Sequence, residues 1–269
     1  MAYLDVKSFN YDGISSDTFN LGIGWFEGDL ENDTSTGLGV ELKRGEMNMV
    51  RTEPNQYGAI YNDTLTFEFA IFDKNNISFT AEQSHALNKW LRKSNVYKKL
   101  VFYDEKYQTS IFYAVCTDVV DAVYNGVNGK KLTFVCNSPF GFAPKSKRKE
   151  IVTGSKTFVV NNLSDQGIYY PTLTITSSDG NEVSIENESD NEQVMTVTFD
   201  NVSNNKIVID SKKCTLTDDE GKIIPAYKVG WTAESIYWPR LIEGKNTFTI
   251  TGNCEIVFEL EFPRKVGTA

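Results

Sequence analysis

The stretch KLTFVCNSPFGFAPKSKRK, from Lys131 to Lys149, separates two different sequence patterns. Its first part alternates apolar and polar residues, with Leu132, Phe134 and Cys136 on one face, and this alternation predicts a strand. The strand should end before Pro139, because proline has no N–H for a sheet ladder and has a fixed φ. The residues that follow predict an interdomain hinge, formed by Pro139, Phe140, Phe142 and Pro144.

The basic residues at the end of this stretch, from Lys145 to Lys149, predict a solvated linker rather than a binding site. Cationic side chains so close together are rarely buried as a group. The chain of 269 residues is long enough to bury two cores. We therefore expect a first domain over residues 1–140 and a second over residues 141–269.

The first domain is expected to contain one amphipathic helix, at about residues 80–93. Thr80 and Gln83 have the spacing of a capping box. Three apolar residues fall on one face at helical spacing, namely Leu87, Trp90 and Leu91. The clearest strands are expected at 64–72, 98–103, 110–117 and 131–137, and the polar segment 28–38 is expected to be an exposed loop. These patterns predict an α+β domain in which the helix packs on an antiparallel sheet.

The second domain shows no helical period, and its short alternating runs predict a β-sandwich. Turn residues separate these runs, including Asp179 with Gly180 and Gly252 with Asn253. Strands are expected at 156–160, 171–176, 182–186, 194–199, 206–210, 214–217, 222–227, 246–251 and 255–262. The expected fold class is therefore mainly β with one helix.

The composition excludes several classes of protein. A net charge of −9 argues against direct binding to nucleic acid or to anionic lipid, since both need clustered cations. No apolar stretch approaches the roughly 18 residues of a membrane span, and the first residues do not resemble an export signal, so we expect synthesis in a cytoplasm without membrane insertion. The four cysteines, Cys116, Cys136, Cys214 and Cys254, are widely spaced and predict buried thiols.

No enzymatic site is expected. The single histidine, His85, lies within the predicted helix, and no GxSxG, HExxH or P-loop pattern is present. Acidic residues gather between Asp179 and Glu192, but such a cluster is typical of solvated loops and lacks the spacing of a calcium loop. We therefore predict no catalytic residue, no cofactor and no metal site.

The order of the elements resembles the distal tail proteins of bacteriophages with long non-contractile tails. Five segments carry the resemblance: FTAEQSHALNKWLRKSNVYKKLVFYD at 79–104, LTFVCNSPFGFA at 132–143, YYPTLTI at 169–175, KIVID at 206–210 and WPRLIEGKNTFTITG at 238–252. The resemblance covers nearly the whole chain, and these segments follow the order and spacing of that family.

The resemblance implies a fold, a function and partners. The first domain would form a homo-oligomeric ring, usually of six copies, and the second would be a galectin-like β-sandwich outside it. The protein would be a structural virion component, a hub in the tail tip or baseplate. Its implied partners are the tail-tube protein, the tail-associated lysin or hub protein, and receptor-binding or other baseplate proteins.

The alternative function is a carbohydrate-binding module that recognises host cell-wall polysaccharide. Three aromatic residues in the second domain are candidates for stacking on sugar rings: Trp231, Tyr237 and Trp238. The sugar site of galectins uses histidine and arginine with a stacked tryptophan, and this domain offers Arg240 but no histidine. The competing interpretation is that Trp231 and Trp238 are core or interface aromatics, and fold alone does not decide function.

Overall fold

The computed structural model describes residues 7–24, 40–45, 56–61, 63–93, 95–103, 110–124, 126–199, 202–231 and 236–265. The chain forms two compact units. The first ends at Phe142 and also includes the residues from Lys265, and the second is Ala143–Arg264. The division thus falls two residues after the predicted one, because the short strand β10 (Gly141–Phe142) pairs with a strand of the first unit through Phe142 and Ile111.

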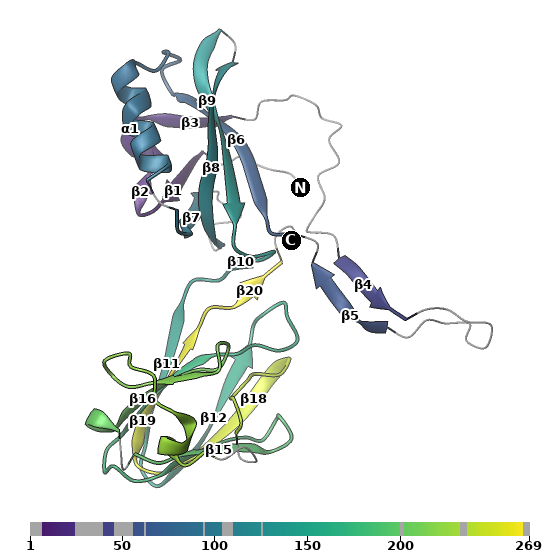
Figure 1. The fold of residues 1–269 in the computed structure, drawn as a ribbon, viewed down its shortest axis with the longest axis vertical. Coiled ribbons are helices and arrows are strands. Elements are labelled where there is room, and N and C mark those ends of the chain that lie inside the picture. Colours follow the sequence, from purple (N-terminus) through teal and green to yellow (C-terminus); the bar gives the residue numbers. More distant parts are fainter. Residues whose placement is uncertain are drawn as a thin grey trace, which may run out of the picture. The chain divides into compact units, whose positions relative to one another are not determined.

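The first unit is built on one antiparallel sheet (Figure 1). Its strands are β1 (Ser8–Tyr11), β2 (Ile14–Ser15), β3 (Leu21–Gly24), β6 (Thr66–Asp73), β7 (Lys98–Tyr103), β8 (Ile111–Tyr124) and β9 (Val127–Cys136). They lie in the order β2-β1-β7-β8-β9-β6-β3, with β10 on β8. A 3-10 turn, Ser16–Phe19, links β2 to β3. A separate two-stranded hairpin is formed by β4 (Val40–Arg44) and β5 (Gln56–Tyr61). The predicted loop at 28–38 lies outside the described residues.

The predicted helix is confirmed as α1, Ala81–Leu91, two residues shorter at its end than expected. The Thr80 hydroxyl accepts from the Gln83 N–H at 3.2 Å, and the Gln83 side chain accepts from the Thr80 N–H at 2.9 Å. This reciprocal pair satisfies two N–H groups that the first turn would leave without partners. The apolar face, Leu87, Trp90 and Leu91, is buried as predicted.

Replacing Thr80 with alanine should destabilise the first unit by about 1 kcal/mol, the usual effect of losing an N-cap side chain. The free energy of unfolding, measured by urea titration with far-ultraviolet circular dichroism, checks this value. Thr80→Ser keeps the hydroxyl and is the matched control, expected to lie within about 0.5 kcal/mol of the parent protein. Equal stability of all three proteins would show that the cap contributes nothing.

Aromatic rings fill the core between α1 and the sheet. Phe134 of β9 stacks on Phe69 of β6 with ring centroids 5.6 Å apart, and its edge faces Tyr11 at 5.0 Å. Leu132, Phe134 and Cys136 are all buried, so the strand face predicted from the opening stretch is confirmed. Ala70 is also buried although it lies on the opposite face of β6 from Phe69, so buried and exposed residues alternate only in the first part of this strand.

The second unit is a β-sandwich of two antiparallel sheets around one core. Five strands form one sheet in the order β11 (Ser146–Val152), β19 (Cys254–Leu260), β13 (Thr172–Ser177), β16 (Lys206–Asp210) and β17 (Thr215–Thr217). Four form the other, in the order β12 (Ser155–Asn162), β18 (Gly244–Thr251), β14 (Val183–Asn187) and β15 (Gln193–Val197). The short strand β20 is Pro263–Arg264.

The core of the sandwich uses the inward residues that alternation predicted. Leu173 and Ile175 from one sheet and Phe248 and Ile250 from the other are fully buried in a single cluster. The turns predicted at Gly180 and Gly252 are also found, and the two glycines have φ of 75° and 127°. A residue with a side chain is strained at such positive φ, so glycine fits these turns.

The basic segment 145–149 is not a linker, and that prediction was wrong. It is largely the edge strand β11, which pairs with β19 along its whole length. Lys147 forms an ion pair with Glu259, and Lys149 pairs with Glu255 at 2.7 Å. Charged side chains on the solvent face of an edge strand oppose pairing with foreign strands. The alternation of β11 was hidden because charged residues occupy both of its faces, Lys147 and Lys149 on one and Arg148 and Glu150 on the other.

Two further predictions in the second unit were wrong. Residues 222–227 form no strand. Ile223 makes one isolated bridge to Thr217, and a 3-10 turn, Ala226–Val229, follows Pro225. Cys214 is exposed rather than buried, at a turn residue with φ of 54°. The other three cysteines are buried as predicted.

Candidate functional site

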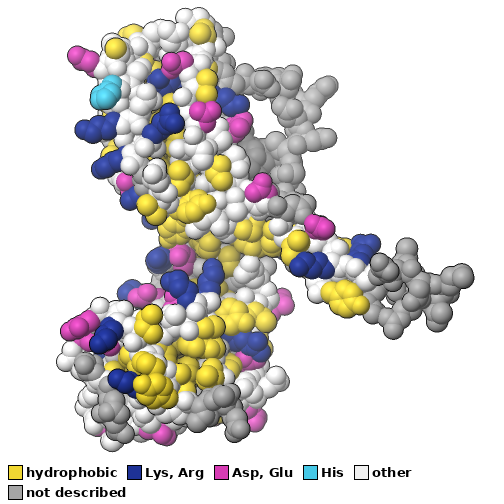
Figure 2. Space-filling view, in the orientation of Figure 1, with side chains coloured by type: hydrophobic (Ala, Val, Ile, Leu, Met, Phe, Trp, Pro, Cys, Tyr) yellow, Lys and Arg dark blue, Asp and Glu magenta, His cyan; other side chains and the backbone are white. Residues whose placement is uncertain are grey.

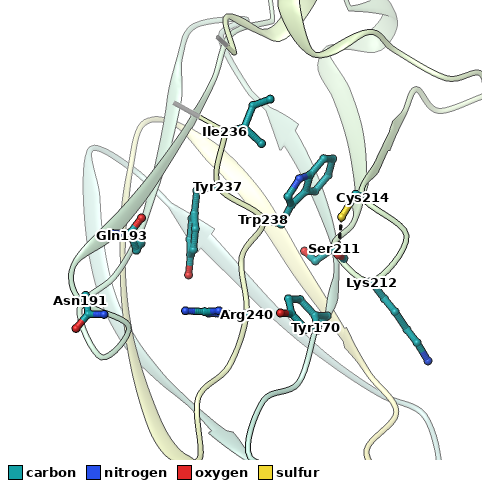
Figure 3. A pocket seen from close by; sticks show the side chains of 10 residues that line it. All are labelled: Tyr170, Asn191, Gln193, Ser211, Lys212, Cys214, Ile236, Tyr237, Trp238 and Arg240. Atoms are coloured by element: carbon teal, nitrogen blue, oxygen red, sulfur yellow. Dashed lines mark hydrogen bonds between the residues drawn. The ribbon is translucent and has the colours of Figure 1, made fainter. Parts of the chain in front are cut away.

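A pocket of about 590 Å³ lies on the second unit, where segments from four parts of its sequence meet (Figure 3). Tyr170 precedes β13, Gln193 begins β15 and Ser211 follows β16. The segment before β18 supplies two further aromatic side chains, Tyr237 and Trp238, together with Arg240. Figure 3 shows the rings of Tyr237 and Trp238 on opposite sides of the pocket, with the ends of the Arg240 and Tyr170 side chains below them.

An ion pair anchors the base of this pocket. The carboxylate of Asp190 is 3% exposed and accepts from Arg240 Nε at 2.7 Å and from Nη2 at 3.0 Å. It also accepts from the Tyr237 hydroxyl at 2.8 Å. Such a bidentate contact fixes both the guanidinium and the tyrosine in place, so the pocket has a rigid floor.

The electrostatics of this cluster follow from the same contacts. The hydrogen bonds from Arg240 hold the pKa of Asp190 below its ordinary value, although burial opposes this effect. Burial raises the pKa of Tyr237, and the neighbouring Asp190 carboxylate raises it further. Asp190 raises the pKa of Arg240 in turn. At neutral pH the cluster therefore holds one carboxylate, one guanidinium and one neutral phenol.

A buried amide network positions the segment that carries Arg240. The side chain of Asn187 donates to the Arg240 carbonyl at 2.9 Å and to Asn246 Oδ1 at 3.2 Å. Asn246 accepts from the Ile242 N–H and donates to the Ile242 carbonyl, both at 2.9 Å. Asn187 and Asn246 are fully buried, so these bonds fix the backbone from 240 to 246 against the sheet.

The three aromatic residues proposed for sugar stacking separate into two groups. Trp231 is 4% exposed and donates its indole N–H to the Thr196 carbonyl at 2.6 Å. It packs edge-on against Trp238 at 5.1 Å and belongs to the core. Tyr237 and Trp238 are partly exposed and line the pocket. The sequence did not single out Asp190, Tyr170 or Ser211, and Asp190 is hidden in a run of acidic residues.

The predicted hinge residues are distributed over both units. Phe140 is buried in the first unit, where its ring meets Tyr61 edge-on at 5.0 Å. Phe142 contacts the ring of Tyr113 at 5.7 Å. Pro139 is half-buried, and Pro144, in the second unit, is exposed. The role of these four residues as an interdomain hinge stays a prediction.

The hairpin of β4 and β5 presents apolar side chains to solvent (Figure 2). Val40 and Leu42 alternate along β4, and Tyr61 lies opposite Val40 in the register, so all three share one face. They are 47%, 39% and 39% exposed. A two-stranded hairpin is only marginally stable by itself, so this element is expected to gain stability by packing on another surface.

Other candidate sites have no supporting geometry. His85 is exposed on α1. In the part of the chain that the structure describes, no group of three or more His, Cys, Asp or Glu side chains is placed to hold a metal ion. None of the described helices is long and apolar enough to cross a membrane.

Two family models cover almost the whole chain. Residues 4–138 match the phage tail protein N-terminal domain, and residues 140–260 match the phage tail C-terminal domain. The chain belongs to the phage tail proteins. No curated protein matches it.

The fold of this tail protein is similar to that of a solved structure. The crystal structure of the SPP1 Dit protein (gp 19.1) is described as a paradigm of the hub adsorption apparatus in phages that infect Gram-positive bacteria. The two chains align with a TM-score of 0.62 over 95% of this chain and 98% of that one, at 15% sequence identity. The mostly β fold with one helix, expected from the sequence, is confirmed.

Proposed function

We propose that this tail protein is the structural hub of a phage tail tip, where copies of its first unit form a closed ring. The observation that supports the proposal is the similarity in fold, over 95% of this chain, to a protein of a hub adsorption apparatus. The matches to the N-terminal and C-terminal phage tail protein domains agree with it. A ring of six copies is the proposed assembly. Identical subunits that contact one another head to tail close into such rings when the rotation between them allows it.

The hairpin of β4 and β5 is the proposed contact between neighbouring copies. Val40 and Leu42 of its apolar face are exposed in the single chain, and Tyr61 on the same face is 39% exposed although its ring also contacts Phe140. Burying these side chains against the next subunit would remove apolar surface from water, which is the main driving force of association. The contact joins different surfaces of the two copies, as ring closure requires.

The position in the virion and the partners follow from this role. The ring would join the tail-tube protein to the tail-associated lysin or hub protein, and receptor-binding or other baseplate proteins would attach at its periphery. The chain would be made in the host cytoplasm and assembled into the tail without binding nucleic acid, inserting into a membrane or catalysing a reaction. A galectin-like sandwich on the outside is the proposed form of the second unit.

Gold-labelled antibodies against the purified chain test the position in the virion. Label at the end of the tail distal to the capsid supports the hub role. Label along the tail tube or on the capsid would contradict it. Tails treated with antibody raised against an unrelated cytoplasmic protein are the control for adventitious labelling.

Charged residues on the apolar face of the hairpin should disrupt the ring. Val40→Asp with Leu42→Asp is expected to reduce the sedimenting species to the monomer, because two carboxylates would have to be desolvated at the contact. Both residues are exposed in the single chain, so its circular dichroism should not change. Glu41→Ser with Lys43→Ser, on the opposite face of the same strand, is the matched control. A ring that persists in the Asp variant would exclude the hairpin as the contact.

A further inference from the structure

The pocket on the second unit contains a buried hydroxyl without a partner. Ser211 is 1% exposed, and its Oγ makes no hydrogen bond in the structure. Figure 3 shows this side chain directed into the pocket between Tyr170 and Trp238. Buried polar side chains are nearly always hydrogen-bonded, so an unpaired one at the wall of a pocket points to a bound molecule that completes it.

The charges around the pocket favour a neutral ligand. The guanidinium of Arg240 is held by the buried carboxylate of Asp190, so the two charges balance at the floor. The side chain of Lys212 extends away from the space between the aromatic rings (Figure 3). The other polar lining residues are uncharged and are Tyr170, Asn191, Gln193, Ser211 and Cys214.

The shape of the lining favours a ligand with apolar faces and polar edges. Tyr237 and Trp238 present rings on two sides of the pocket, and aromatic side chains combine a large apolar surface with polar edges. Polar groups converge at its base, where they fix the orientation of a ligand. The volume of about 590 Å³ lies within the range of small-molecule sites.

We propose that this pocket binds a neutral sugar residue, with its apolar face against Tyr237 or Trp238 and a hydroxyl hydrogen-bonded to Ser211. This function is additional to the hub role and does not depend on ring formation. A sugar ring has the required combination of C–H faces and hydroxyl edges. The site retains Tyr237 and Trp238 as binding residues, whereas Trp231 supports Trp238 from the core.

The full-length protein should bind neutral sugars weakly and selectively. The probes are glucose, galactose, N-acetylglucosamine and N-acetylgalactosamine with their di- and trisaccharides, titrated while the fluorescence of the tryptophans is followed. At the usual ligand efficiency of small molecules, one sugar ring corresponds to a Kd of about 1 mM. At least one of these sugars is expected to saturate the protein, and no binding by any of them up to about 10 mM would overturn the proposal.

Two variants assign the binding to this pocket. Ser211→Ala should weaken binding about five- to tenfold, because it removes one hydrogen bond to the ligand. Ile236→Arg, at an exposed position on the lining, should weaken it at least as much by placing a bulky cation over the rings. Ser184→Ala, on the other sheet, is the control and should leave Kd unchanged.

The same variants distinguish a ligand site from a water site. If Ser211 only holds an ordered water molecule, Ser211→Ala will bind sugar as the parent protein does, and the proposed role of the hydroxyl is wrong. If both Ser211→Ala and Ile236→Arg retain the parent Kd, the sugar binds elsewhere and the proposal fails. The sedimentation of each variant, compared with the parent, shows separately whether the assembly has changed.

Discussion

Replacing Trp90 with alanine should destabilise the first unit by about 4 kcal/mol, one of the two largest effects expected for this protein. The indole is 7% exposed and stacks between Phe9 and Phe19, with ring centroids 5.5 and 5.0 Å away. Its N–H donates to the Tyr11 carbonyl at 3.0 Å. Alanine would leave a large cavity between α1 and the sheet and a buried carbonyl without its donor.

Urea unfolding followed by far-ultraviolet circular dichroism measures this change. Among the described residues α1 is the only α-helix, and it belongs to the first unit, so the helical signal reports on that unit. Trp90→Phe is the matched variant. It keeps an aromatic ring in the stack but loses the hydrogen bond, so we expect a loss of about 1 to 2 kcal/mol. If Trp90→Ala costs less than about 1 kcal/mol, α1 is not held by this aromatic cluster.

Replacing Asp190 with alanine should destabilise the second unit by about 3 kcal/mol. The change leaves the Arg240 guanidinium and the Tyr237 hydroxyl without their acceptor, and breaking a buried ion pair is costly for this reason. We expect a loss at the lower end of the usual range for breaking a buried ion pair, because the Arg240 side chain is 35% exposed and keeps some access to water. Chemical unfolding followed by tryptophan fluorescence, to which Trp231 and Trp238 of the second unit contribute, measures the effect.

The effect of Asp190→Ala should depend on pH. The pKa of Asp190 is lower in the folded protein than in the unfolded chain, because Arg240 donates hydrogen bonds to the ionised form. The ion pair therefore contributes its full stability above about pH 4 and loses it as the pH falls through the folded pKa. The difference between the parent protein and Asp190→Ala should shrink below about pH 4.

The control for Asp190 is Glu220→Ala, at an exposed turn of the same unit. It removes one carboxylate and should change the unfolding free energy by less than about 0.5 kcal/mol. Two results would contradict a role for the Asp190 charge at the floor of the pocket. One is a loss of unfolding free energy in Asp190→Ala no larger than that in Glu220→Ala. The other is a loss that stays constant from neutral to acidic pH.

Local patterns were sufficient to predict most of the elements. The capping box at Thr80 and the helical spacing of Trp90 depend only on near neighbours, and both are found in the structure. Alternation identified β7 at Lys98–Tyr103 and β16 at Lys206–Asp210 with their observed bounds. It failed for β11, because alternation is visible only when inward and outward residues differ in polarity.

The pocket was harder to predict, because its residues come together only through the topology of the sandwich. Tyr237 and Trp238 were singled out as aromatics near one another in sequence. Asp190 lies about 50 residues away from Arg240, a separation that no local spacing reveals. The sequence also could not show whether Trp231 is buried or exposed, because tryptophan serves both as a core residue and as a binding residue.

The mass of the full-length chain in solution tests the proposed ring most directly. Light scattering over a range of concentrations should approach the mass of six copies of the 30.3 kDa chain, about 182 kDa, with the monomer present only on dilution. A mass that stays at 30.3 kDa at every concentration, with both units folded, would contradict self-assembly of the chain into a ring.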